Sequence, residues 1–289
     1  MGWQKISALI CNIIVCLSFG FGVLLFYKIG KPTVQGFYCN DDSINKPFKN
    51  STLPSKEVTI VAMVLCLFCF IVVESYNVFL NKLSGSSLGQ YARQNAKSLS
   101  YTVIALFCIY LFGAGVTMFI TDVGKYTVGR LRPHFYAVCK PDWKKLNCTD
   151  SSGVNNYFVG DHFCRASQEK MKEARLSFPS GHSSFSAFSA FHLVFYIQSQ
   201  LAVTNKFGFV PKVCVQVLLV CLAFYCGCSR IADNKHHPTD VAAGLFLGVA
   251  VAYCFHVVLS QKRQERILSQ RSVNDSANVS VMIDRMNQE

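Results

Sequence analysis

The stretch Val58–Phe79 reads VTIVAMVLCLFCFIVVESYNVF and contains one charged residue, Glu74. It exceeds the roughly 18–20 apolar residues that cross a bilayer core of about 30 Å. Comparable blocks occur elsewhere in the chain, at Ile6–Tyr27, Thr102–Ile120, Ser183–Leu201, Val210–Cys228 and Val241–Leu259. None shows the alternation of polar and apolar residues that is typical of a membrane β-barrel. The sequence therefore predicts an all-α polytopic membrane protein with six transmembrane helices.

The composition supports this class over a soluble protein. Hydrophobic residues make up 51% of the chain and charged residues 15%. The formal net charge is +12, but no soluble basic domain exists to bind nucleic acid. An anionic membrane surface or an anionic substrate explains the charge better, so we expect membrane lipids as partners and no nucleic acid. The first block is too long for the apolar region of a cleaved signal peptide, and we expect it to remain as an anchor.

Six crossings would place both termini on one side of the membrane. The loops 28–57, 121–182 and 229–240 would share the other side, with the longest loop between the third and fourth spans. Glycosylation acceptors at Asn50 and Asn147 lie in these loops, as do four cysteines: Cys39, Cys139, Cys148 and Cys164. An oxidising compartment explains both features, although the sequence leaves the disulfide pairing open. We therefore predict an exterior or luminal face for these loops and cytosolic termini.

Other signals do not decide the orientation. The distribution of Lys and Arg favours neither side, and two further glycosylation acceptors, Asn274 and Asn278, lie in the tail. We expect residues 1–260 to form one membrane domain and residues 261–289 to form a disordered cytosolic tail. The plasma membrane is the expected location, with an endomembrane as the alternative.

A first charged cluster, KYTVGRLRP, follows the third apolar block and runs from Lys125 to Pro133. If the helix continued through it, Lys125 and Arg132 would lie two turns apart on one face. Two converging cations suit a dianionic phosphoryl group, because Arg offers a planar fork of donors and Lys a point charge. The alternative is a basic collar whose side chains reach the membrane interface.

A second cluster, FPSGHS at residues 178–183, enters the fourth block. Ser180 is a natural N-cap for a helix, and Gly181 allows a close approach to its backbone. The free N–H groups and the positive dipole end of a helix N-terminus form an anion site. His182 would lie beside that anion, where it could protonate a leaving alkoxide. The alternative is a helix cap with an interfacial histidine.

A third cluster lies between the fifth and sixth blocks and contains Arg230, His236 and Asp240. On a helical turn Asp240 would accept a hydrogen bond from one ring nitrogen of His236 and leave the other free to attack phosphorus. A His-x-x-x-Asp pair can also bind a metal, but a complete ligand set needs further carboxylates or histidines. The nearby partners are cations, so this arrangement favours phosphate. His237 is a less suitable nucleophile because it lies three residues from Asp240.

In order and without substitution, these clusters resemble the motifs of the type 2 phosphatidic acid phosphatase superfamily. The motifs are Lys-x₆-Arg-Pro, Pro-Ser-Gly-His and Ser-Arg-x₅-His-x₃-Asp. The segments 36–43, 129–135 and 175–178 are also similar to those of animal lipid phosphate phosphatases. The six-span layout agrees, so the resemblance covers the chain from the first span to the sixth and leaves out the tail.

The resemblance implies a role for each motif residue. His236 would attack phosphorus and become a phosphohistidine, with Asp240 orienting it, and His182 would protonate the departing lipid hydroxyl. The phosphoryl oxygens would be held by Lys125, Arg132, Arg230, Ser180 and Gly181. The resemblance further implies catalysis without a metal or cofactor, homo-oligomers, and substrates such as phosphatidate, lysophosphatidate, sphingosine 1-phosphate and ceramide 1-phosphate.

Other functions remain open at this point. The same chemistry on a sugar phosphate or a polyisoprenyl diphosphate is one alternative, and a non-catalytic lipid-phosphate binding protein is another. A channel would need more charged residues deep within the spans than Glu74 and two histidines. We expect Glu74 to lie near the membrane interface on the side of the termini or to bond a neighbouring helix. Gly244 and Gly248 in the sixth block are typical of close helix packing.

Overall fold

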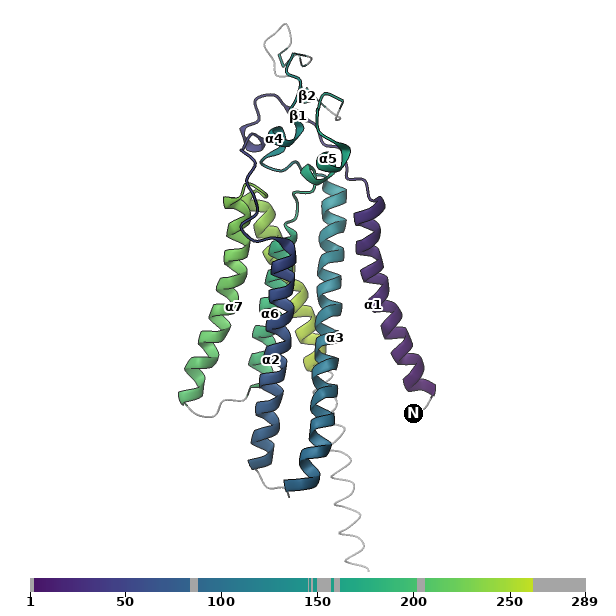
Figure 1. Ribbon diagram of the computed structural model, residues 1–289, viewed down its shortest axis with the longest axis vertical. Coiled ribbons are helices and arrows are strands. Elements are labelled where there is room, and N and C mark those ends of the chain that lie inside the picture. The colour runs from purple at the N-terminus through teal and green to yellow at the C-terminus, as the bar shows by residue number, and fades with distance from the viewer. Residues whose placement is uncertain are drawn as a thin grey trace, which may run out of the picture.

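The structure is a computed structural model that describes residues 3–83, 88–144, 146, 148–149, 157–158, 162–201 and 206–261. Long helices form a bundle, and a small cap lies at one end of it (Figure 1). The labelled long helices are α1 (Trp3–Ile29), α2 (Ser55–Leu83), α3 (Leu88–Val128), α6 (Gly181–Gln200) and α7 (Lys206–Ala232). A last helix, Pro238–Gln261, completes the bundle.

Among the described residues, four helices are long and apolar enough to cross a membrane. They are Ser55–Phe79, Leu99–Val128, Gly208–Ala232 and Pro238–Gln261. The all-α membrane class is therefore confirmed, whereas six spans remain a prediction. In α1, the apolar stretch found is the shorter Leu17–Ile29.

Helix α6 is less apolar than its neighbours because it lies inside the bundle. It packs against α7, α3 and α2, so most of its surface meets protein and not lipid. Several of its buried residues are serines with hydrogen-bond partners. The Ser184 hydroxyl bonds that of Thr121 at 2.8 Å, and the Ser189 hydroxyl bonds that of Tyr110 at 2.9 Å. A hydropathy pattern underestimates such a helix, since internal bonds satisfy its polar groups.

Two small residues bring the last helix against α6. A Cβ atom at Gly244 would lie 2.5 Å from the Ser180 carbonyl oxygen, and one at Gly248 would lie 2.3 Å from that of Ser184. The prediction of close helix packing at this pair is confirmed. Glu74 accepts a hydrogen bond from the Tyr196 hydroxyl of α6 at 2.8 Å, as expected for a bond to a neighbouring helix.

Helix α3 ends at Val128 because the next residue is a glycine in the left-handed region. Gly129 has φ 62°, and its N–H donates to the Lys125 carbonyl at 3.0 Å. A Cβ atom there would lie 1.9 Å from the Thr33 carbonyl oxygen, so no other residue fits without rearrangement. The condition under which Lys125 and Arg132 would share one helix face is therefore not met. Arg132 lies in the segment after the helix.

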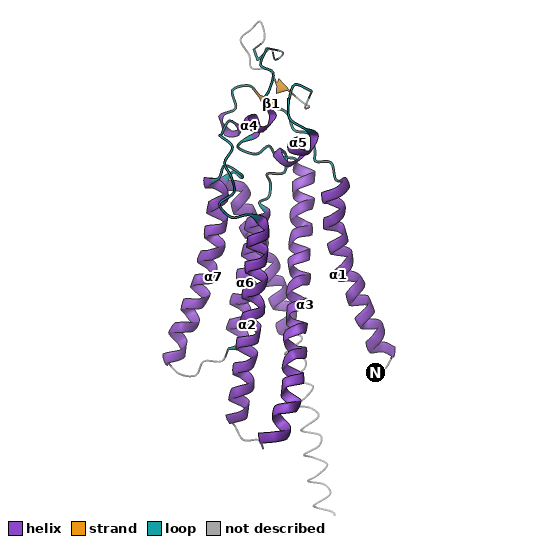
Figure 2. Cartoon of the chain, viewed as in Figure 1, coloured by secondary structure: helices purple, strands orange, loops and turns teal. Residues whose placement is uncertain are grey.

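The cap consists of two chain segments held by disulfides. It contains β1 (Phe37–Tyr38), the short 3₁₀ helix η1 (Asp42–Ile44), α4 (Phe135–Cys139), β2 (Tyr157–Phe158) and α5 (Gln168–Ala174). Strands β1 and β2 pair antiparallel. In Figure 2, strand is drawn in orange above α4 and α5. Bonds Cys39–Cys148 and Cys139–Cys164 confirm that the four loop cysteines form disulfides and give their pairing.

The cap has a hydrophobic core of its own, separate from that of the bundle. Its buried members include Phe37, Leu131, Phe135, Phe163 and Met171. This core and the disulfides fix the segment that follows α3 above the helix ends. Asn50 is exposed. The second predicted glycosylation site, Asn147, lies outside the described residues. The predicted tail also lies outside them, at residues 262–289.

Candidate active site

The three charged clusters of the sequence meet at the capped end of the bundle. The N–H of Ser180, before α6, donates to the carbonyl of Asp240 in the first turn of the last helix, at 3.0 Å. The N–H of Ser177 donates to the carbonyl of Arg130, after α3, at 3.1 Å. Main-chain hydrogen bonds therefore join the ends of three helices that are far apart in the sequence.

The N-terminus of α6 begins at the N-cap that the sequence predicts. Ser180 is the N-cap, and its hydroxyl oxygen accepts from the Ser183 N–H at 3.4 Å. A Cβ atom at Gly181 would lie 3.1 Å from Lys125 Nζ, so this ammonium group lies directly against the helix end. A cation at the positive end of a helix dipole is unfavourable by itself. An anion bound between them would be stabilised by both.

Arg132 reaches the same region from beyond the end of α3. Its guanidinium donates to a carboxylate oxygen of Glu173 at 2.5 Å, and its side chain is 11% exposed. Its Nε is buried and has no hydrogen-bond partner in the part of the chain that the structure describes. An unsatisfied buried donor costs free energy. A ligand oxygen would satisfy it, so the residue has a free donor for an anion.

His236 is held in one tautomer by the main chain. Its Nδ1 lies 2.7 Å from the carbonyl oxygen of Ser177, and its side chain is 4% exposed. A carbonyl oxygen only accepts, so Nδ1 carries the proton and Nε2 has the lone pair in the neutral ring. Burial, with the charges of Arg132 and Lys125, lowers the pKa of His236 well below its ordinary value. The ring is therefore neutral at pH 7 with a nucleophilic Nε2.

Asp240 does not accept a hydrogen bond from His236, contrary to expectation. The two groups are 3.9 Å apart, because His236 lies before the first residue of the last helix and not within a helical turn. The Asp240 carboxylate accepts from the Ser177 hydroxyl at 2.6 Å, from Arg130 at 2.6 Å, and from the N–H and ring of His237 at 2.9 and 3.2 Å. It therefore acts on His236 through Ser177, whose carbonyl holds the ring.

His182 is oriented in a similar way by α2 and the residues before it. Its Nε2 lies 3.2 Å from the Leu53 carbonyl oxygen and 3.4 Å from the Ser55 hydroxyl. Nε2 therefore carries the proton of the neutral ring, and Nδ1 is the nitrogen free to exchange one. Burial, together with the charges of Arg230 and Lys125, lowers the pKa of His182 to about 4. A bound phosphoryl dianion would oppose this shift and favour the protonated ring.

Arg230 is buried, and its positive charge is partly neutralised by Asp233. Its side chain is 1% exposed, and it donates to the Ser229 hydroxyl and to Asp233 at 2.9 Å. Asp233 also accepts from the N–H and the hydroxyl of Thr52, which ties this arginine to the loop before α2. The charges of Arg230, Lys125 and Arg132 all lower the pKa of His182. The predicted cations are thus brought together around the two histidines.

Sequence reasoning missed the residues that hold the site in place. Ser177 and Arg130 lie inside segments recognised from the motifs, but nothing in their spacing indicates bonds to Asp240 and His236. Asp233 had a detectable signal, since it lies three residues after Arg230, a spacing that pairs charges on one helix face. Lys235 is a further buried cation, and its Nζ lies 3.8 Å from the centroid of the Phe48 ring.

In the described part of the chain, no group of three or more His, Cys, Asp or Glu side chains is placed to hold a metal ion. The cations Lys125, Arg132 and Arg230 are paired with the carboxylates of Asp122, Glu173 and Asp233, and they surround two neutral histidines. Cations gathered in this way suit an anion. Catalysis without a metal stays a prediction.

Comparison with known proteins agrees with the motifs. Residues 106–264, which include all three clusters, match the PAP2 superfamily. The chain belongs to the PAP2 superfamily. Similar proteins include phospholipid phosphatase 1 of Mus musculus, 34% identical over 83% of this chain and 80% of the relative. Phospholipid phosphatase 2 of Homo sapiens is 35% identical over 84% of this chain and 78% of its own length. No solved structure matches.

Membership of the PAP2 superfamily confirms the family expected from the sequence and a phosphatase as the class of enzyme. The apolar helices and these relatives also confirm an integral membrane protein. Within this PAP2 protein, the matched region contains α6, α7, the last helix and the part of α3 nearest the site.

Proposed function

We propose that this protein hydrolyses the phosphomonoester of membrane lipid phosphates through a phosphohistidine at His236. Phosphatidate, lysophosphatidate, sphingosine 1-phosphate and ceramide 1-phosphate are the substrates we expect. The observation that carries the proposal is the hydrogen bond from His236 Nδ1 to the Ser177 carbonyl. It leaves Nε2 with a free lone pair in a site where the charges of Arg132 and Lys125 act on the ring.

In the first step, His236 Nε2 forms a bond to phosphorus as the bond to the lipid oxygen breaks. A protonated His182 gives the proton on Nδ1 to the departing alkoxide, so the lipid leaves as an alcohol. Negative charge on the equatorial oxygens is stabilised by Lys125, Arg132, Arg230, the Ser180 hydroxyl and the Gly181 amide.

In the second step, a water molecule attacks the phosphohistidine. His182, now neutral, takes a proton from this water as its oxygen bonds to phosphorus and the bond to His236 Nε2 breaks. Inorganic phosphate leaves, and both histidines return to their starting forms. Protein cations stabilise the charge in both steps, so the scheme uses no metal or cofactor.

We further propose six spans, with α1 and α6 as the first and fourth, both termini cytosolic and the capped end outside the cell or in a lumen. The plasma membrane is the expected location, and homo-oligomers are expected. The two disulfides of the cap support an oxidising compartment on that side. If the cap is luminal, replacing Asn50 or Asn147 with Gln should increase gel mobility by the mass of one glycan. Unchanged mobility in both variants would contradict the glycosylation sites.

Trapping the phosphoenzyme tests the chemistry. Phosphatidate radiolabelled in its phosphate is mixed with the protein, and the reaction is quenched in alkali. The labelled phosphoryl group should remain on His236, because phosphohistidine survives alkali and is lost in acid. His236→Ala should show no label and no turnover while keeping its helical circular dichroism. Label on another residue, or turnover in the variant, would refute this nucleophile. Turnover of glucose 6-phosphate in preference to phosphatidate would refute the substrate class.

A further inference from the structure

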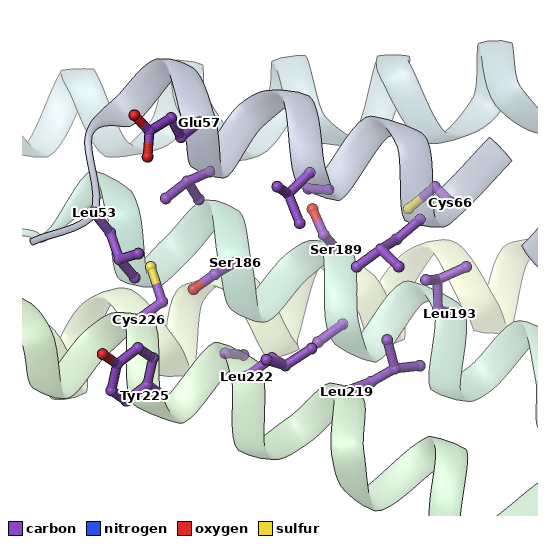
Figure 3. A pocket seen from close by; sticks show the side chains of 16 residues that line it. Leu53, Glu57, Cys66, Ser186, Ser189, Leu193, Leu219, Leu222, Tyr225 and Cys226 are labelled. Carbon is purple, nitrogen blue, oxygen red and sulfur yellow. The ribbon is translucent and has the colours of Figure 1, made fainter. Parts of the chain in front are cut away.

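An apolar cavity of about 270 Å³ lies between α2, α6 and α7 (Figure 3). Its walls are mostly aliphatic side chains, and Glu57, in the first turn of α2, is the charged residue among them. Ser186 and Ser189 of α6 also line it. This cavity is distinct from the cluster of cations described above.

One end of the cavity adjoins His182. The carbonyl of Leu53, a lining residue, accepts the hydrogen bond from His182 Nε2. The thiol of Cys226, another lining residue, lies 3.9 Å from the His182 carbonyl oxygen. In Figure 3, Leu53, Glu57 and Cys226 lie together at one end, and Cys66 lies at the other. One end of the cavity therefore lies beside residues that contact the proposed proton donor, and the cavity runs from there along the helices.

The length of the cavity corresponds to the depth of one membrane leaflet. From Glu57 to Cys66 the rise along α2 is about 14 Å, at about 1.5 Å per residue. A leaflet contributes half of a hydrocarbon core of about 30 Å. Cys66 is fully buried and closes the far end. A chain that begins at the phosphate site thus has room to descend through its own leaflet and no further.

The cavity is a groove open to lipid along one side. Val61, Leu222 and Tyr225, on its edges, are 55%, 46% and 56% exposed. Its floor is buried and includes Ala190 of α6 and Ala223 of α7. With Ala62 of α2, these small side chains leave the space that larger residues would fill.

We infer that this groove seats one acyl chain of the lipid phosphate whose phosphoryl group lies between His182 and His236. Ala62, Ala190 and Ala223 then set its width and act as specificity determinants. The inference rests on the proposed function. A substrate chain is the occupant that fits, because the groove joins the phosphate site at one end and the bilayer along its side. Moving a chain from lipid into an apolar groove changes its hydrophobic burial little. The groove therefore acts by fixing the direction of the chain, and with it the position of phosphorus.

Filling the groove tests this inference. Ala62→Phe is compared with Ala105→Phe, which adds the same ring at an exposed position of α3. Each is assayed in detergent micelles with dioleoyl phosphatidate and with the water-soluble p-nitrophenyl phosphate. We expect the ratio of the two kcat/KM values to fall at least tenfold in Ala62→Phe and to stay unchanged in Ala105→Phe. An unchanged ratio in Ala62→Phe would overturn the inference, whether both activities persist or fall together.

A series of lysophosphatidates tests the unmodified protein. With chains from hexanoyl to oleoyl at a constant mole fraction in micelles, kcat/KM should rise with chain length and then level off once the groove is filled. Equal kcat/KM along the series would overturn the inference. The proposed function fails separately, if the unmodified protein hydrolyses none of these lipids or if His236→Ala still does.

Discussion

Two regions of the protein adjoin each other at His182, but they are built differently. One is the rim, which is the site at the capped end of the bundle with His182, His236 and the cations around them, and the other is the apolar groove. In the rim, each histidine and the carboxylate of Asp240 have hydrogen-bond partners that fix their positions. In the groove, small side chains such as Ala190 and Ala223 leave space, and few polar groups are present. The rim and the groove should therefore control different properties of the enzyme. Changes in the rim should affect every phosphomonoester, whereas changes in the groove should affect substrates with long chains.

The largest of these effects is expected for His182→Ala. Loss of the general acid should lower kcat for phosphatidate about 100- to 10,000-fold. Soluble glycerol 3-phosphate should lose as much, because its leaving alkoxide also needs a proton. Turnover of p-nitrophenyl phosphate should fall less, since nitrophenolate leaves without one. A steady-state comparison of the three substrates checks this, and a loss confined to phosphatidate would remove the distinction between rim and groove.

Arg132→Lys should have the next largest effect. The lysine keeps the charge but loses the planar fork and the Nε donor that has no partner among the described residues. A hydrogen bond to a charged group contributes about 1.5–3 kcal/mol, so kcat/KM should fall about 10- to 100-fold for lipid and soluble substrates alike. Lys170→Arg, an exposed change in α5, serves as a control. Unaltered kinetics in Arg132→Lys would show that this side chain does not contact the phosphoryl group.

Ser177→Ala should have a smaller effect. It removes the hydroxyl bond to Asp240 and keeps the carbonyl that accepts from His236, so kcat should fall about tenfold with little change in KM. As a positioning residue, Ser177 should alter the chemical step and not substrate binding. A change in KM alone, measured with p-nitrophenyl phosphate, would contradict the role we assign to it.

The smallest effect concerns the pH profile. Because burial and nearby cations lower the pKa of His236, its neutral form persists as the pH falls below 6.5, the ordinary histidine value. The acid limb of kcat/KM should therefore lie below pH 6.5. Arg132→Gln removes a positive charge that lowers this pKa, so the limb should move to higher pH. A limb that stays in place would show that Arg132 does not act on the nucleophile.

Much of the fold follows from local sequence. The apolar block 58–79 predicts a membrane helix, and α2 contains it. Ser180 predicts the N-cap of α6 because its hydroxyl satisfies a free N–H at the helix start. In contrast, the block at 183–201 predicts a span, but α6 is not among the four described helices long and apolar enough to cross a membrane. Its serines are tolerated because neighbouring helices supply their partners.

The sequence by itself predicted that both histidines and the surrounding cations would belong to one site, since all of them lie within the three motifs. Tertiary structure decided how these residues are held. His236 donates a hydrogen bond to the Ser177 carbonyl and not to Asp240. The last helix begins at Pro238, so a spacing of four residues does not place His236 and Asp240 on one helical turn. Arg132 leaves the helix because Gly129 ends it, and the cysteines pair across segments far apart in the chain. Such contacts depend on the distances in space between segments, and the spacing of residues along the sequence does not give these distances.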